Sequence, residues 1–219
     1  MTNKFLPEHN CNLCPRLVTF REEWKIRNPC WHNAPVSSFG SLNAMLLIVG
    51  LAPGLRGANA TGRPFTGDYA GNLLYTTLIN KGYAKGIYNK RSDDDLKLIN
   101  CRITNAVRCV PPINRPTSIE GRTCGQFLTG EIAIMPKLHG ILAIGNFAHN
   151  AVLAALNCKK SIFPFTHNAT HHISDQLLLI DSYHCSRLNI NTGRLTESMF
   201  HQVFNTVDTI IKEITTTSY

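Results

Sequence analysis

Four cysteines have the spacing of metal ligands. Cys11 and Cys14 form a C-x2-C pair near the start of the chain, and Cys109 and Cys124 form a second pair with 14 residues between them. Four thiolates could close a tetrahedral zinc site or hold an iron–sulfur cluster. A redox role for Cys11 and Cys14 is less consistent with the sequence, because redox pairs begin a helix in a β-α-β unit and these two precede every expected strand. The spacing predicts a metal site and leaves zinc and iron–sulfur open.

A glycine-rich loop indicates a second ligand site. Residues 50–71 read GLAPGLRGANATGRPFTGDYAG and contain six glycines and two prolines. Glycine lets the main chain approach a ligand closely and adopt positive φ values. The loop is not a phosphate loop, because its G-x4-G spacing is followed by Arg63 and Pro64, where that motif needs Lys and then Ser or Thr. The G-x-G-x-x-G pattern of dinucleotide-binding folds is absent as well.

Four short apolar segments are expected to form the strands that position these motifs. Continuous apolar runs of this length are typical of strands buried on both faces, and helical patterns alternate with them. The expected strands are residues 44–51, 99–107, 137–145 and 176–184, and the expected helices are residues 69–81, 119–135, 147–157 and 196–214. The alternation predicts a three-layer α/β/α fold with a parallel sheet, in a single domain of residues 1–219. Residues 1–43 are expected to be a helical and irregular lead-in that packs on this domain.

Polar motifs follow the expected strands. Asn105 ends the second strand, and His184 ends the fourth and opens a turn. In sheets of this kind, ligands bind beyond the carboxyl ends of the strands. The sequence therefore places Asn105, His184 and the glycine-rich loop at one edge of the sheet. His184 has the position of a catalytic donor there, and the alternative is a strand-end histidine with a purely structural role.

The composition indicates a basic protein with an anionic partner. Of the 219 residues, 43% are apolar, and no apolar run approaches the ~18 residues that a membrane span requires. Lys and Arg outnumber Asp and Glu by 22 to 14, which gives a net charge of +8 and favours a polyanion, although a basic protein without such a partner would have the same charge. We expect a cytoplasmic monomer that does not associate with membranes and whose eight cysteines are thiols or metal ligands.

The motifs GLAPG, TGRPFTGD, NAVRC and HCSR-x-N-x-x-TGRLT, taken with the four spaced cysteines, resemble those of the uracil-DNA glycosylase superfamily. The resemblance is to its family 5 (type-b) enzymes, which are related to the iron–sulfur family 4, and it runs from about Cys11 to Leu195. It implies an α/β/α fold with a central four-stranded parallel sheet. It also implies that a structural 4Fe–4S cluster is held by Cys11, Cys14, Cys109 and Cys124.

The resemblance implies an enzyme that starts base excision repair by hydrolysing the bond between uracil and deoxyribose in DNA. Such a site must hold an extruded base, stabilise its negative charge and present water to the sugar. The resemblance assigns base stacking to Phe65, the base edge or the water to Asn105, and the departing base to His184. The other residues expected to bind the base are Gly50, Ala52 and Gly54.

One position differs from many members of the superfamily. Ala52 stands where many have an Asn or Asp that directs the water, an absence that the family 5 enzymes share. The nearest replacement is Asp68, whose carboxylate could orient water and favour a cationic sugar. The alternative role of Asp68 is to cap the helix that begins near Tyr69. Without a polar selector at Ala52, the site is expected to accept other deaminated bases, such as hypoxanthine and xanthine.

The fourth motif is expected to contact DNA. Arg187 and Asn189 lie on the segment that the resemblance assigns to the gap left by the flipped nucleotide and to its phosphates. Relatives commonly have proline after the histidine of this motif, and Cys185 in its place predicts a looser turn. The residues expected to bind DNA are Arg63, Ser186, Arg187 and Asn189.

Two other functions fit parts of the sequence. The first is a strict uracil-DNA glycosylase like those of family 4. Ala52 argues against it, because that family usually has an acidic residue at this position. A non-catalytic iron–sulfur module that binds DNA or senses damage could have kept the fold. An assay for release of uracil from DNA separates an enzyme from such a module.

Overall fold

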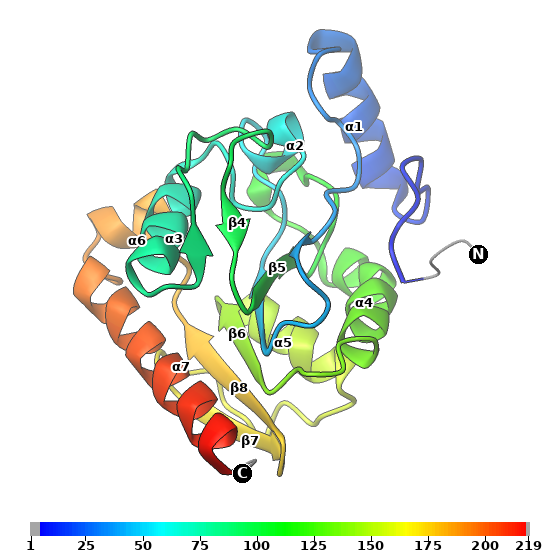
Figure 1. Cartoon of the computed structure of the whole chain (residues 1–219). Helices are drawn as coiled ribbons and strands as arrows, with labels where there is room; N and C mark the ends of the chain where they lie inside the picture. Colours follow the sequence, from blue (N-terminus) through cyan, green and yellow to red (C-terminus); the bar gives the residue numbers. More distant parts are fainter. Residues whose placement is uncertain (1–4, 218–219) are drawn as a thin grey trace.

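The computed structural model describes residues 5–217, and the side chains of residues 5–212. Its centre is a six-stranded sheet in the order β1-β5-β2-β6-β8-β7 (Figure 1). The four inner strands are parallel to one another, and the two edge strands are antiparallel to their neighbours. The strands of this sheet are β1 (Phe39–Gly40), β2 (Leu46–Gly50), β5 (Cys101–Asn105), β6 (Gly140–Ile144), β7 (Thr170–Ser174) and β8 (Leu177–Ser182).

The four inner strands are the four that the sequence predicts, and the two edge strands are additional. All residues of β2, β5 and β6 are buried, as expected for strands covered on both faces. Edge strand β1 has two residues, and β7 alternates between exposed and half-buried side chains without an apolar run. Neither edge strand carries the continuous apolar signal by which the inner strands are recognised.

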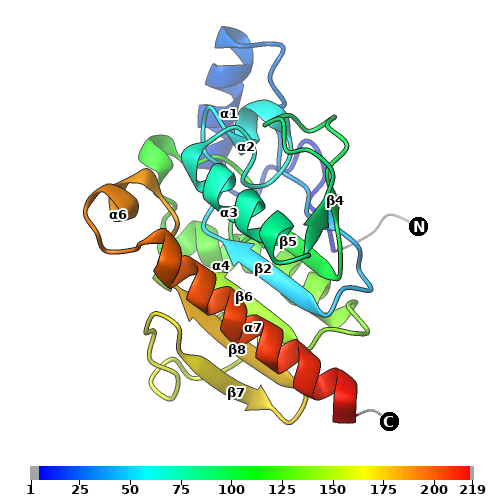
Figure 2. The same cartoon turned by 60° about the vertical axis from the view of Figure 1, so that its left-hand side comes forward.

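Helices cover both faces of the sheet. Leu46 and Ile48 of β2 pack in one apolar cluster with residues of α3 and α7, whereas Leu47 and Val49 pack in another with residues of α4 and α5. Figure 2 shows α3 and α7 together on one side of the sheet. The predicted three-layer arrangement is confirmed. The helices that form the outer layers are α3 (Tyr69–Asn80), α4 (Ser118–Ala133), α5 (Asn146–Ala155) and α7 (Glu197–Thr217).

Shorter elements build the edge of the sheet where the strands end. The lead-in forms one helix, α1 (Pro15–Arg27), whose Leu17 packs against Cys109 and Cys124 in a third apolar cluster. The remaining elements are α2 (Ala58–Thr61), the hairpin strands β3 (Ala84–Lys85) and β4 (Lys97–Leu98), the 3₁₀ turn η1 (Pro112–Asn114) and α6 (Arg187–Asn191). The lead-in therefore packs on the domain through its cysteine-bearing end, as expected.

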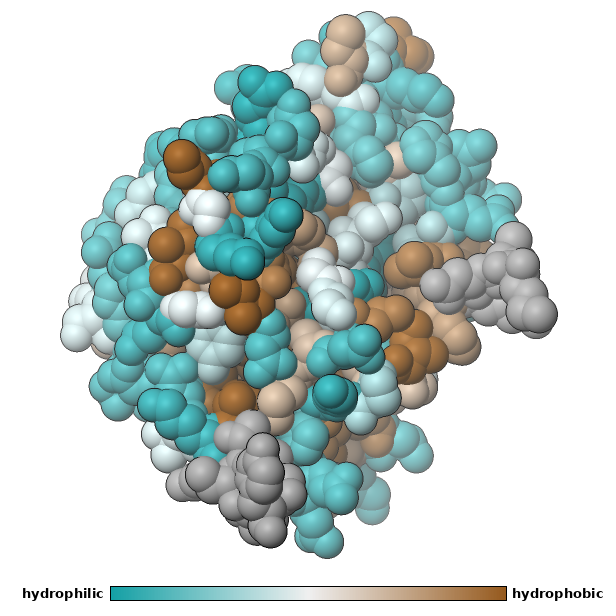
Figure 3. All heavy atoms as spheres, viewed as in Figure 1, coloured by the Kyte–Doolittle hydropathy of each residue, from teal (hydrophilic) through white to brown (hydrophobic). Residues whose placement is uncertain are grey.

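The surface is mostly polar. Figure 3 shows a face on which hydrophilic side chains predominate and apolar ones gather in small patches. None of the helices described within residues 5–217 combines the length and apolar character needed to cross a membrane.

Candidate active site

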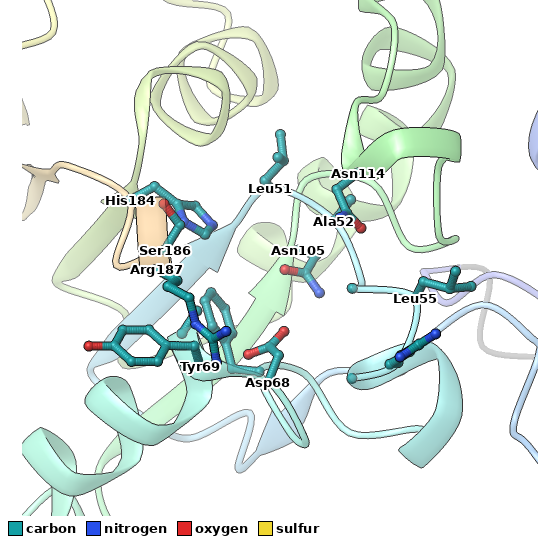
Figure 4. Close-up of a pocket in the computed structure, with 15 residues that line it drawn as sticks. Leu51, Ala52, Leu55, Asp68, Tyr69, Asn105, Asn114, His184, Ser186 and Arg187 are labelled. Carbon is teal, nitrogen blue, oxygen red and sulfur yellow. The ribbon is translucent and has the colours of Figure 1, made fainter. Parts of the chain in front are cut away.

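A cavity of about 490 Å³ lies beyond the carboxyl ends of β2, β5 and β8. This volume suits a small, largely buried ligand such as a nucleobase with part of its sugar. Figure 4 shows side chains from the loop after β2, the end of β5 and the turn after β8 converging on it. The lining residues are Leu51, Ala52, Gly54, Leu55, Arg56, Gly57, Phe65, Asp68, Tyr69, Ala70, Asn105, Asn114, His184, Ser186 and Arg187. The strand ends thus bring together residues that are widely separated in the sequence.

Phe65 lines the cavity in a strained conformation. Its φ is 53°, in the left-handed region that a bulky residue adopts only when its surroundings fix it. Two tyrosine hydroxyls provide that support, since Tyr75 donates to the Pro64 carbonyl at 2.6 Å and Tyr88 donates to the Phe65 carbonyl at 3.2 Å. A side chain at Gly71 would overlap the same Phe65 carbonyl oxygen. The ring is therefore held in place before any ligand binds.

Asn105 lies beside Phe65 at the end of β5. It pairs in register with Gly50 of β2, where a Cβ atom would be 2.5 Å from both the Asn105 Oδ1 atom and the Phe65 ring. Gly50 is therefore a packing requirement for both residues. The Asn105 side chain is buried, and no described residue hydrogen-bonds its amide. A buried amide without a protein partner is available to bind a ligand.

Asp68 both caps α3 and faces the cavity. Its Oδ1 atom accepts a hydrogen bond of 2.9 Å from the backbone N–H of Gly71, the geometry of an N-cap. The second oxygen, Oδ2, lies against the glycine-rich loop, where a Cβ atom at Gly54 or Gly57 would be only 2.9 or 2.8 Å away. Burial raises the pKa of Asp68 above its ordinary value. The two roles considered for Asp68 are thus compatible, because each uses a different carboxylate oxygen.

His184 presents a neutral ring to the cavity. The ring lies nearly parallel to Phe65, with centroids 6.4 Å apart and an interplanar angle of 26°. Burial lowers the pKa of His184 to about 4, because the charged form is desolvated there. No described residue hydrogen-bonds a ring nitrogen of His184. At neutral pH the ring therefore has one N–H that can donate to a ligand without bringing a full charge.

The turn after His184 is tied down by its own residues. The side chain of Asn189 donates to the His184 carbonyl at 2.8 Å, and Ser186 caps α6 by accepting from the Asn189 N–H at 3.3 Å. Cys185 is fully buried, and its thiol donates to the Ala70 carbonyl at 3.6 Å. These contacts hold the turn in the absence of the proline, and the looser turn expected from Cys185 stays a prediction. One N–H of the Asn189 amide thus holds the His184 carbonyl.

Arg63 corrects a prediction. It was expected to bind DNA, but it is 4% exposed and forms a bidentate ion pair with Asp94, with N–O distances of 2.6 and 2.8 Å. Its guanidinium lies between 5.1 and 5.7 Å from the ring centroids of Phe39, Tyr75 and Tyr88. Arg63 thus joins the glycine-rich loop to the segment that contains β3 and β4. The sequence could not reveal this role of Arg63, because its partner Asp94 lies 31 residues further along the chain and no local pattern links the two residues.

The remaining residues expected to bind DNA lie at the mouth of the cavity. Arg187 is exposed, and its guanidinium lies 5.4 Å from the centroid of the Tyr69 ring. Ser186 also lines the cavity. Sequence reasoning missed Leu188, which is 71% exposed on α6 between Arg187 and Asn189. The available signal was an apolar residue directly between Arg187 and Asn189.

The four spaced cysteines come together beside α1. Cys109 and Cys124 are buried, Cys11 and Cys14 are half-buried, and all four line one small cavity. Burial raises the pKa of Cys14 to about 11 and that of Cys109 to about 12, and the neighbouring cysteines add to both shifts. Arg21 donates to the Cys109 sulfur at 3.4 Å, and the Arg108 backbone N–H donates to the Cys124 sulfur at 3.3 Å. Hydrogen-bond donors to sulfur stabilise a metal group bound by thiolates. The raised pKa values mean that these thiols lose their protons more readily when a positive charge, such as a metal ion, is present.

The spacing of the sulfur atoms bears on the size of that group. Four thiolates around one zinc ion lie about 3.8 Å from one another, given a Zn–S distance of about 2.3 Å and tetrahedral geometry. Among the described residues, no three cysteine sulfurs lie within 4.8 Å of one another. The described cysteine sulfurs are therefore not drawn together around a single tetrahedral ion in this structure.

The α/β/α domain thus carries, at one edge of its sheet, a pocket lined by an aromatic ring, a neutral histidine, an amide and a carboxylate. The family model described as the uracil DNA glycosylase superfamily matches residues 37–208. The chain belongs to this superfamily, and to its type-5 branch.

Curated relatives support the assignment. The type-5 uracil-DNA glycosylase of Thermus thermophilus is 43% identical over 202 residues, covering 88% of this chain and 90% of that protein. The type-5 uracil-DNA glycosylase of Pyrobaculum aerophilum is 38% identical over 199 residues, covering 89% of this chain and 86% of that protein. A type-4 uracil-DNA glycosylase of the same organism is 34% identical over 145 residues, covering 66% of this chain and 60% of that protein.

Proposed function

We propose that the protein hydrolyses the N-glycosidic bond of uracil in DNA, and that it also releases hypoxanthine and xanthine. The observation that carries this proposal is the convergence of Phe65, Asp68, Asn105 and His184 on one cavity. Water attacks the sugar carbon as the bond to the base breaks, and the bonding electrons leave with the base as an anion. Such a reaction needs a ring platform, an anion-stabilising donor and a group that orients water.

Each side chain has a role in this step. The extruded base stacks on Phe65, and the free amide of Asn105 hydrogen-bonds its edge. The N–H of neutral His184 donates to a base oxygen on which negative charge grows, which stabilises the transition state more than the ground state. Asp68 faces the sugar side, where Oδ2 orients the water and favours the cationic sugar.

The wider substrate range rests on Ala52. Its methyl group lines the cavity and offers no donor or acceptor to the base. A site selects strongly against a base only when a buried polar group would be left unpaired by it. Ala52 lacks such a group, so bases that share a carbonyl at the His184 position should be released.

Cleavage of defined oligonucleotides tests the proposal. We expect single-turnover release of uracil, hypoxanthine and xanthine from duplexes that carry each base opposite each partner. Ala52→Asp is expected to retain uracil release better than release of the purines, since it restores a polar group at that position. Release of uracil alone would contradict the wider range, and release of no base would favour the non-catalytic DNA-binding alternative.

We propose that Cys11, Cys14, Cys109 and Cys124 hold a 4Fe–4S cluster. The meeting of the four cysteines at one cavity and the two donors to sulfur support a thiolate-bound metal group, and the resemblance to the family 5 enzymes favours the cluster over zinc. The cluster, when bound, joins α1 to the loop after β5 and supplies no chemistry to the reaction. Protein purified without oxygen is expected to contain about four irons per chain and to absorb broadly in the visible range. One zinc per chain without iron would contradict the proposal, and Cys30→Ser serves as a control that should keep all iron.

A further inference from the structure

An exposed isoleucine occupies an unfavourable backbone conformation next to a residue that lines the cavity. Ile113 has φ 50° and ψ 25°, and Asn114 follows it with φ 55°. Asparagine tolerates this left-handed region, whereas a β-branched residue is a true outlier there. The Ile113 side chain is also 81% exposed. A single exposed isoleucine is ordinary, but one that also occupies a strained conformation suggests that the site requires this side chain.

The surroundings of Ile113 hold it in this position. The backbone N–H groups of Asn114 and Arg115 donate to the carbonyls of Pro111 and Pro112, at 3.2 and 3.1 Å, which closes the 3₁₀ turn. Arg16 of α1 donates to the Arg115 carbonyl at 3.1 Å. Hydrogen bonds therefore hold both the 3₁₀ turn itself and the residue that follows it.

Arg16 also links the loop to helix α4. Arg16 also forms an ion pair with Glu120 at 2.7 Å, and Glu120 takes part in the capping box of Thr117 at the start of α4. The loop lies between Cys109 and Cys124, which both pack against α1. A side chain on such a loop is pre-organised, so little conformational entropy is lost when it meets a partner.

Ile113 precedes Asn114, which lies across the cavity from Ser186 and Arg187 (Figure 4). Its neighbour Asn114 lines the cavity, and Figure 4 shows Asn114 near Ala52, on the opposite side from Ser186 and Arg187. Leu188 is also exposed, and it follows Arg187, another residue that lines the cavity. Two exposed apolar side chains thus neighbour residues on opposite sides of the cavity that an extruded base must enter. Apolar side chains of this kind can press between base steps and keep a duplex opened.

We propose that Ile113 is a second apolar contact to duplex DNA, which packs against the base pair beside the extruded nucleotide and keeps that nucleotide out of the stack. This inference rests on the proposed function. Its partner is the exposed face of a nucleobase in a duplex, and the +8 charge of the chain favours approach to the phosphates around it. Ile113 acts on extrusion of the base and not on the chemical step, so it is a positioning residue.

Comparison of double- and single-stranded substrates tests the inference. Ile113→Ala is expected to slow single-turnover release of uracil from a duplex by about 5- to 20-fold, the range for truncation of a partly buried aliphatic side chain. Release from a single strand should be unchanged, because no neighbouring base pair competes for the extruded nucleotide. A 2-aminopurine placed beside the uracil should brighten less with the variant than with the parent.

Matched variants separate this role from a structural one. Ile113→Val, which stays apolar and β-branched, should retain most of the duplex activity. Ile26→Ala, at a residue that is 84% exposed on α1 and does not line the cavity, should cleave both substrates like the parent. Equal loss on both substrates, or no loss on the duplex, would overturn the inference. A parent protein that released uracil from neither substrate would instead contradict the proposed function.

Discussion

Asp68→Asn is expected to release uracil at least about 100-fold more slowly than the parent in a single turnover, while its affinity for uracil-containing DNA stays the same. Loss of one preorganised polar group of this kind costs roughly 3 kcal/mol of transition-state stabilisation. The substitution keeps an oxygen that can accept from the Gly71 N–H, so the cap of α3 survives. What it removes is the charge on the oxygen that lies against Gly54 and Gly57.

The stability of Asp68→Asn gives an independent measurement. Because burial raises the pKa of Asp68, its ionisation at neutral pH opposes folding, and this cost grows as the pH rises through the raised pKa. The asparagine variant is therefore expected to melt at the same temperature as the parent or higher at neutral pH. Asp68→Ala, which also removes the cap, should lose about 1 kcal/mol relative to Asp68→Asn.

Two outcomes would change the assignment. If Asp68→Asn releases uracil as fast as the parent, Asp68 is only a cap, and Asn105 becomes the leading candidate for holding the water. If the variant is slow but also melts early, the loss of rate is structural. Asp93→Asn is a suitable control, since that carboxylate is exposed and pairs only with Arg91 among the described residues.

The sequence predicted the parts of the fold that depend on a repeated local signal. The inner strands are continuous apolar runs because both of their faces are buried, and each run was recognised from that property. Strand β7 reads Thr-His-His-Ile-Ser, with Ile173 as its one apolar residue, and its pairing with β8 is set by tertiary contacts. A pattern based on neighbours in the sequence cannot detect such an edge strand.

The site shows the same division. Asn105 and His184 could be placed together because parallel strands end at one edge of the sheet. Arg63 belongs to the same glycine-rich loop, but its role is set by Asp94, which no periodicity connects to it. The motif identified Arg63 as a candidate, but whether its side chain faces DNA or the interior depends on the fold. The hydrogen bond of Asn189 to the His184 carbonyl could not be predicted for a related reason, since it depends on the shape of the turn.

His184 gives the second large effect. His184→Gln keeps an N–H donor but changes its position and acidity, and it is expected to slow uracil release by roughly 100-fold. The control is His172→Gln, because that histidine is exposed on the edge strand β7 and should not affect the rate.

The pH dependence identifies the form of His184 that acts. Burial lowers the pKa of His184 to about 4, so the ring stays neutral where an ordinary histidine, with a pKa of about 6.5, would become charged. The ratio of the parent rate to the His184→Gln rate is therefore expected to be constant between about pH 8 and pH 5, because protonation of Asp68, whose pKa is raised, affects both proteins alike. A change in the parent rate near pH 6.5 that the glutamine variant lacks would mean that His184 acts as an imidazolium.

Stability follows the same titration with a defined sign. Between pH 6.5 and 4 the unfolded chain binds a proton at His184 that the folded chain excludes, so acidification favours unfolding through this residue. Melting temperatures of the parent should fall across this interval more steeply than those of His184→Gln, which cannot bind that proton. Parallel falls in both proteins would show that the ring is charged in the folded state, and the neutral-donor mechanism would then be wrong.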